Sequence, residues 1–98
     1  MSFSLGLTPS AKQSLKELKS SAHLEKCFKA VSKALKFLAE DPRHPSLQTH
    51  QYLSIFGPNK EKVFEAYAEQ DTPAAYRIFF YYGHTRGEIV VFAITPHP

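Results

Sequence analysis

The first half of the chain repeats apolar residues at the spacing of amphipathic helices. Thr8 and Pro9 predict a helix start, because threonine caps free amides and proline suits the first helical position. A second helix is predicted from about residue 23 to residue 40, and Pro42 ends it. The apolar positions of these two helices are Ala11, Leu15, Leu18, Ala22, Leu24, Cys27, Phe28, Val31, Leu35 and Leu38.

The second half of the chain has the composition of β-strands. Residues 63–69 alternate loosely between apolar and polar types, and residues 75–82 and 88–95 are dense in β-formers. Gly83 and Gly87 bracket a five-residue loop, which predicts an antiparallel hairpin. With a further short strand at residues 3–7, the predicted order is β-α-α-β-β-β. This is an α+β fold, in which a helical hairpin packs on a twisted antiparallel sheet.

The composition of the chain indicates which classes of protein it can belong to. The 98 residues are 43% hydrophobic, which predicts a single domain over residues 1–98. The longest apolar run, residues 89–94, is far shorter than the roughly 20 residues of a membrane span. The N-terminus lacks the features of a signal peptide, and one cysteine cannot form an internal disulfide. We therefore expect a soluble protein of the cytoplasm, with no membrane partner.

The net charge of the chain gives a weak indication of the kind of partner that it binds. Twelve Lys and Arg against nine Asp and Glu give a net charge of +3. This excess suits contact with a polyanion such as RNA, or with an acidic protein, although lysine rows on helices also serve simply as a solvated surface. The lysines away from the apolar stripes are Lys12, Lys16, Lys19, Lys26, Lys29, Lys33 and Lys36.

Three segments resemble one known superfamily. Asp-Pro-Arg-His-Pro-Ser-Leu-Gln-Thr-His at residues 41–50, and Ala-Tyr-Arg-Ile-Phe-Phe at residues 75–80, are similar to segments of RelE/ParE toxins. The ending Phe-Ala-Ile-Thr-Pro-His-Pro, residues 92–98, resembles the histidine-bearing C-terminal segment of YafQ-like members. The resemblance implies the RelE-like fold and a toxin that a cognate antitoxin neutralises. RelE-like members cut mRNA in the ribosomal decoding site, whereas ParE-like members inhibit DNA gyrase without cutting.

Metal-free RNA cleavage needs proton transfer and positive charge at the phosphate. Arg77 interrupts an apolar strand, and RelE-like toxins place a catalytic arginine at this position of the motif. The guanidinium fork suits a phosphate. The alternative is an arginine at the sheet rim, paired with Glu65 or Glu69.

Histidines are the candidates for proton transfer. By resemblance to YafQ-like members, His97 is an acid or base, and Pro96 and Pro98 restrict its backbone. His50 is the second candidate, and His44, six residues earlier, is assigned to substrate binding. Alternatively, His97 is a terminal residue without a role. The segment that contains His44 and His50 then only caps the helical hairpin and forms hydrogen bonds to the sheet. No spacing typical of a metal site is present, so no metal or other cofactor is expected.

The remaining candidates concern substrate binding. RelE-like enzymes carry lysines on the strand before the Tyr-Arg motif, and here Lys60 and Lys62 lie just before that strand as substitutes. Arg43 joins them, and Tyr81 can stack on a base or simply pack. The sequence therefore predicts a ribosome-associated endoribonuclease acting on mRNA. The alternative is a non-enzymatic protein-binding toxin, either a gyrase inhibitor or an inactive member bound to its antitoxin. The oligomeric state is left open.

Overall fold

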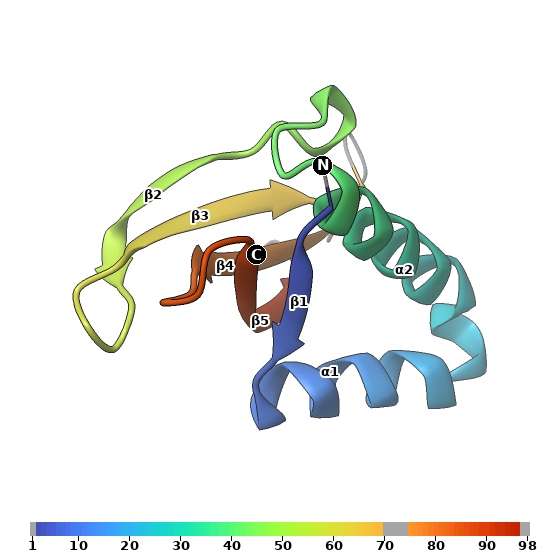
Figure 1. Ribbon diagram of the computed structural model, residues 1–98. Helices are drawn as coiled ribbons and strands as arrows, with labels where there is room; N and C mark the ends of the chain where they lie inside the picture. Colours follow the sequence, from blue (N-terminus) through green and yellow to red (C-terminus); the bar gives the residue numbers. More distant parts are fainter. Residues whose placement is uncertain (1, 70–74, 97–98) are drawn as a thin grey trace.

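The computed structural model describes residues 2–69 and 75–96 of the chain (Figure 1). Its helices are α1, Pro9–Ser20, and α2, Glu25–Glu40, and the short 3-10 turn Ala22–Leu24 joins them. A second 3-10 turn, Pro45–Leu47, follows α2. The strands are β1 Ser4–Leu7, β2 His50–Phe56, β3 Lys62–Tyr67, β4 Tyr76–Tyr82 and β5 Glu88–Pro96.

The strands form one five-stranded sheet in the order β1-β5-β4-β3-β2. The α+β class, the two helices and the predicted strands at both ends of the chain are confirmed. Two details differ from the prediction. The strand His50–Phe56 is absent from the predicted elements, and β1 pairs with β5 in parallel, so the sheet is mixed rather than purely antiparallel. The predicted hairpin joins β4 and β5, and Gly87 in its loop has a φ of +81°, a conformation that favours glycine.

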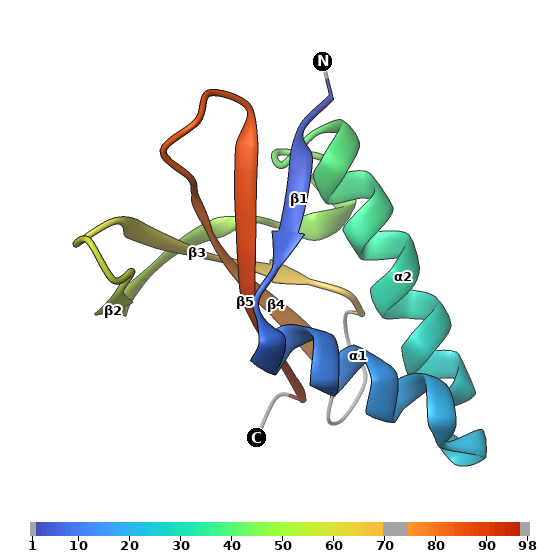
Figure 2. The same ribbon diagram turned by 60° about the horizontal axis from the view of Figure 1, so that its bottom comes forward.

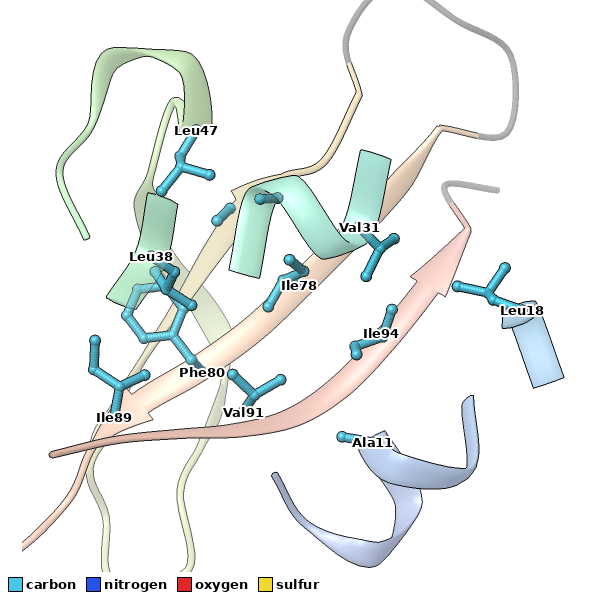
Figure 3. Close-up of a cluster of buried hydrophobic side chains, with 12 residues drawn as sticks. Ala11, Leu18, Val31, Leu38, Leu47, Ile78, Phe80, Ile89, Val91 and Ile94 are labelled. Atoms are coloured by element: carbon cyan, nitrogen blue, oxygen red, sulfur yellow. The ribbon is translucent and has the colours of Figure 1, made fainter. Parts of the chain in front are cut away.

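The core lies between the two helices and one face of the sheet. α1 and α2 cover the same side of the sheet (Figure 2). Their apolar stripes meet alternate residues of β3 and β4, as expected when every second side chain of a strand points to one face. In β5 the core residues are Ile89, Val91 and Ile94, because a register shift opposite Phe79 and Phe80 interrupts the alternation. Figure 3 shows this cluster, which includes Val31, Leu38, Ile78, Phe80, Ile89, Val91 and Ile94. Cys27 packs against the same core, as its position on the helical stripe predicted.

The helices present their lysines to solvent. All seven lysines of the two predicted rows are exposed, and Lys29 forms an ion pair with Glu25 one turn earlier, at 3.3 Å. Such an exposed pair contributes little to stability. No helix among the described residues is long and apolar enough to cross a membrane.

The start of α1 is tied to the sheet. The Thr8 hydroxyl oxygen accepts a hydrogen bond from the backbone N–H of Ala11 at 3.3 Å, so Thr8 is the predicted N-cap. The same hydroxyl donates to the carbonyl of Phe92 in β5 at 3.4 Å. One side chain therefore both begins the helix and fastens it to the central part of the sheet.

Thr8→Ala should lower the free energy of unfolding by about 1–2 kcal/mol, because it removes the cap of α1 and its bond to β5. Thr8→Ser is the matched control, since serine keeps the hydroxyl, and it should lose less than half as much. Urea unfolding followed by circular dichroism measures both values. Equal losses in the two variants would contradict the capping role and point to the methyl group instead.

Candidate active site on the sheet face away from the helices

Three charged or titratable side chains meet on the sheet face opposite the helices. Glu65 of β3 lies between His50 of β2 and Arg77 of β4. His50 Nε2 lies 2.7 Å from Glu65 Oε1, and Arg77 Nη1 lies 2.5 Å from Glu65 Oε2. Each oxygen of the carboxylate therefore has its own cationic or hydrogen-bonding partner. We call these three residues the Glu65 cluster.

Strand register brings the Glu65 cluster together. His50 is directly opposite Glu65 in the β2–β3 pair, and Arg77 is opposite Tyr67 in the β3–β4 pair. Because alternate residues of a strand share a face, Tyr67 and Glu65 lie on the same side as Arg77. The intervening Ala66 points to the helix side and is fully buried. β2, β3 and β4 are neighbours in the sheet (Figure 1), so these side chains come from three adjacent strands.

The Glu65 carboxylate is buried, with a side-chain exposure of 3%. A buried charge is costly unless it is paired and hydrogen-bonded, and the Glu65 cluster supplies both kinds of partner. Burial raises the pKa of Tyr67, and the adjacent carboxylate, which accepts a hydrogen bond from that side chain, raises it further. The Tyr67 hydroxyl therefore stays protonated and acts as a donor beside Glu65.

Arg77 is held on two sides. Its side chain is 15% exposed, its Nη1 donates to Glu65, and its guanidinium carbon lies 5.0 Å from the centre of the Phe79 ring. The buried Nε has no hydrogen-bond partner among the described residues. The alternative weighed for Arg77, an ion pair with Glu65, is thus what the structure contains. Its contact with a phosphate stays a prediction.

His50 is the accessible member of the Glu65 cluster, with its side chain 47% exposed. Its Nδ1 lies 3.1 Å from the carbonyl oxygen of Gln48, and its Nε2 faces the Glu65 carboxylate. Both ring nitrogens therefore face acceptors, so the doubly protonated imidazolium can donate at both positions. An exposed imidazole beside a fixed carboxylate is a suitable group for proton transfer.

Among the described residues, no group of three or more His, Cys, Asp and Glu side chains is arranged to hold a metal ion. The chemistry that the Glu65 cluster can perform is proton transfer at His50 and charge stabilisation by Arg77.

The other predicted site residues lie in several places. Lys60 and Lys62 are exposed near the tip of the β2–β3 hairpin, where Lys62 pairs with Phe56, so they do not join the Glu65 cluster. Tyr81 packs against Phe92, with ring centres 5.8 Å apart. It lies four residues beyond Arg77 on β4, about 13 Å away at 3.3 Å per residue. His97 lies outside the described residues.

Arg43 and His44 lie together in the segment after α2. The His44 ring stacks on Phe37 at 4.2 Å, and its Nδ1 accepts a hydrogen bond from the backbone N–H of Ser46 at 3.1 Å. Arg43 is exposed beside it. Together with His50, these two residues line a groove of about 400 Å³. His44 thus caps the 3-10 turn Pro45–Leu47 rather than the helical hairpin, and its role in substrate binding stays a prediction.

Glu65 is the site residue that the sequence did not single out as functional. It was considered only as an ion-pair partner of Arg77. One signal was available, since Glu65 faces away from Phe64 and Ala66 in an alternating strand, the same pattern that sets Arg77 apart from Ile78. The pairing of Glu65 with His50 had no such signal, because it depends on β2 being a strand.

Comparison with known proteins identifies the fold. No protein-family profile matches the chain, and no curated protein sequence matches it. Solved structures do match over nearly the whole chain. A YoeB/ParE toxin from Agrobacterium tumefaciens has a TM-score of 0.70 and 7% identity, over 97% of this chain and 99% of that one. A chain of the archaeal RelE–RelB complex from Pyrococcus horikoshii has a TM-score of 0.66 and 11% identity, over 98% and 96%.

A third match is the YoeB dimer from Staphylococcus aureus, with a TM-score of 0.64 and 13% identity, over 100% of both chains. At these identities the likeness establishes the fold alone. It agrees with the resemblance of the short sequence segments to the RelE/ParE superfamily, while the closer similarity to YafQ-like members stays a prediction. The chain has the fold of the RelE/ParE toxins.

Proposed function

We propose that this chain is the toxin of a two-gene toxin–antitoxin pair and that it cuts mRNA on the ribosome, in the cytoplasm. The observation that carries the proposal is the Glu65 cluster, which pairs an accessible imidazole with a buried carboxylate and an arginine on one sheet face. The RelE/ParE fold supports the same assignment.

The proposed chemistry needs no metal. His50 transfers a proton, either from the attacking 2′-hydroxyl or to the departing 5′-oxygen. Glu65 orients the His50 ring, and Arg77 supplies positive charge near the phosphate. His97 is proposed as the second acid–base group. Arg43, His44, Lys60, Lys62 and Tyr81 are proposed to bind the RNA strand.

We propose that the antitoxin covers β2. Toxins of this superfamily are neutralised by a partner antitoxin, and one of the similar structures is a RelE–RelB complex. β2 is at the edge of the sheet and exposes Leu53, Ile55 and Phe56. An edge strand with exposed apolar side chains is a suitable surface for an added strand of another protein.

A second function, non-enzymatic binding of a protein such as DNA gyrase, is favoured by one observation. Arg77 is engaged by Glu65 and only 15% exposed, so its guanidinium is less accessible than that of a free phosphate-binding arginine. An inactive, antitoxin-bound member of the superfamily would share this feature. The Glu65 cluster would then be structural, and the exposed surface of β2 would carry the function.

Induced expression of the chain, with mapping of mRNA 5′ ends, tests the proposal. The chain should arrest growth and create new 5′ ends within translated frames. His50→Gln should abolish both effects, whereas His84→Gln, in the exposed β4–β5 loop, should preserve them. Arrest with intact mRNA and trapped gyrase–DNA complexes would establish the second function. Neither arrest nor cleavage would indicate an inactive member.

A further inference from the structure

A groove lies beyond the C-terminal end of α2, and it shares His50 with the Glu65 cluster. Its volume is about 400 Å³, within the range of small-molecule sites. It is lined by Arg43, His44, Pro45, Gln48, Thr49, His50, Gln51, Phe64 and Tyr82. The segment after α2 forms one wall, and residues of β2, β3 and β4 form the other.

The strand side of the groove is aromatic. α2 ends at Glu40, and Tyr82 at the end of β4 is left 39% exposed. Phe64 packs edge-on against the Tyr82 ring, with centres 5.5 Å apart, and stacks on Phe80 at 5.7 Å. The Tyr82 ring is thus held by contacts with Phe64, with Phe80 at 5.9 Å and with Phe3 at 6.3 Å. A supported, partly exposed aromatic ring is a stacking platform for a planar ligand.

The opposite wall of the groove carries positive charge and hydrogen-bond donors. Among residues 2–69 and 75–96, no carboxylate lines the groove and none forms an ion pair with Arg43. Burial raises the pKa of Tyr82, the positive charge of Arg43 opposes this rise, and Asp41 adds to it. His44 has its ring fixed by Phe37 and by the Ser46 N–H, which occupies Nδ1 and leaves Nε2 as the donor.

We propose that this groove binds one nucleotide unit, with the base stacked on Tyr82 and the phosphate at Arg43 and His44. A ligand that matches both walls must combine a planar ring with an anionic group, and a nucleotide does so. Arginine and a fixed imidazole donor suit phosphate oxygens, while stacking accepts any base.

The position of His50 connects this groove to the proposed reaction. His50 lines the groove and also belongs to the Glu65 cluster on the other face. β2 is an edge strand, so an RNA strand can pass around it from one face to the other. The nucleotide in the groove is then a neighbour of the cleaved phosphate. This part of the inference rests on the proposed function, whereas nucleotide binding itself does not.

Binding is measured by NMR titration of the full chain, because it then does not depend on cleavage. The ligands are AMP, adenosine, inorganic phosphate and a 2′-O-methyl trinucleotide, which cannot be cut. AMP should shift the amide signals of the non-proline residues in 43–51 and that of residue 82, and it should bind more tightly than adenosine or phosphate alone. If the natural ligand of the groove is RNA, the trinucleotide should bind more tightly than AMP and compete with it. If AMP binds and the trinucleotide does not compete with it, the natural ligand of the groove is a free nucleotide.

Variants separate the two walls of the groove. Tyr82→Ala should weaken AMP binding about 5- to 100-fold through loss of stacking, and Tyr82→Phe, which keeps the ring, should stay within about twofold. Arg43→Ala should weaken AMP binding about tenfold, without changing adenosine binding. Arg86→Ala, in the exposed β4–β5 loop, is the matched control and should bind like the original chain.

Two results would overturn the inference. One is the absence of AMP and trinucleotide binding in the groove, and the other is binding that neither Tyr82→Ala nor Arg43→Ala weakens. Arg43 is exposed, so its substitution leaves a folded protein even if Tyr82→Ala does not. AMP binding by a chain that cuts no mRNA would support the groove and reject the ribonuclease, so the two proposals fail separately.

Discussion

Glu65→Ala should lower the free energy of unfolding by about 3–5 kcal/mol, the loss typical of breaking a buried ion pair. The substitution removes the carboxylate that accepts from Arg77 and faces His50. Arg77 is then left with a positive charge in a site where its side chain is only 15% exposed. Urea unfolding at neutral pH measures the loss.

A double substitution provides the control. Glu65→Leu with Arg77→Met removes both charges and fills similar volume, and such replacements of buried pairs are often neutral or stabilising. The double variant should therefore recover most of the stability lost in Glu65→Ala. It should still cut no mRNA, because His50 has lost its carboxylate. A loss below about 1 kcal/mol in Glu65→Ala would show that water or movement of Arg77 relieves the unpaired charge.

The two faces of β4 explain what the sequence could predict of the site. Ile78 and Phe80 are buried under the helices, while Arg77 lies on the other face, as strict alternation predicts. A cation in that pattern was therefore recognisable from the sequence. The sequence offers two carboxylates as its partner, Glu65 and Glu69, and the choice of Glu65 depends on the register between β3 and β4.

The strand β2 was the main omission from the predicted fold. Its residues show no alternation of buried and exposed side chains, since all of them except Tyr52 are exposed. The register with β3 is also irregular between Tyr52 and Phe56. An exposed edge strand has few core contacts to select its apolar positions, so periodicity carries little signal there. His50 was named as a site residue, but its proximity to Glu65 could not be predicted without this strand.

The parallel pairing of β1 with β5 has a similar explanation. The strand predicted at residues 3–7 is present as Ser4–Leu7, and its partner could not be chosen from local pattern. Ser4 pairs with Glu88 and Leu7 with Val91, across more than eighty residues of sequence. Contacts between strands so far apart depend on the packing of the whole sheet, which the helices α1 and α2 complete.

Phe80→Ala should also cost about 3–5 kcal/mol, by a different mechanism. Phe80 is fully buried in β4 and lies within the cluster that includes Leu38, Ile89 and Val91 (Figure 3). Removing its ring leaves a cavity between the helices and the sheet that close-packed neighbours fill only in part. Thermal or urea unfolding measures this loss.

Phe56→Ala is the matched control for Phe80→Ala, because the same ring is removed from a position that is 64% exposed. It should change the free energy of unfolding by less than about 0.5 kcal/mol. A domain of this size has a total stability of about 5–15 kcal/mol, so the Phe80 variant loses a substantial part of it while the Phe56 variant keeps nearly all of it. If both variants lost similar stability, β2 would be part of the folding core. Exposed Phe56 would then have a structural role, and the proposal that β2 serves as the antitoxin surface would lose its basis.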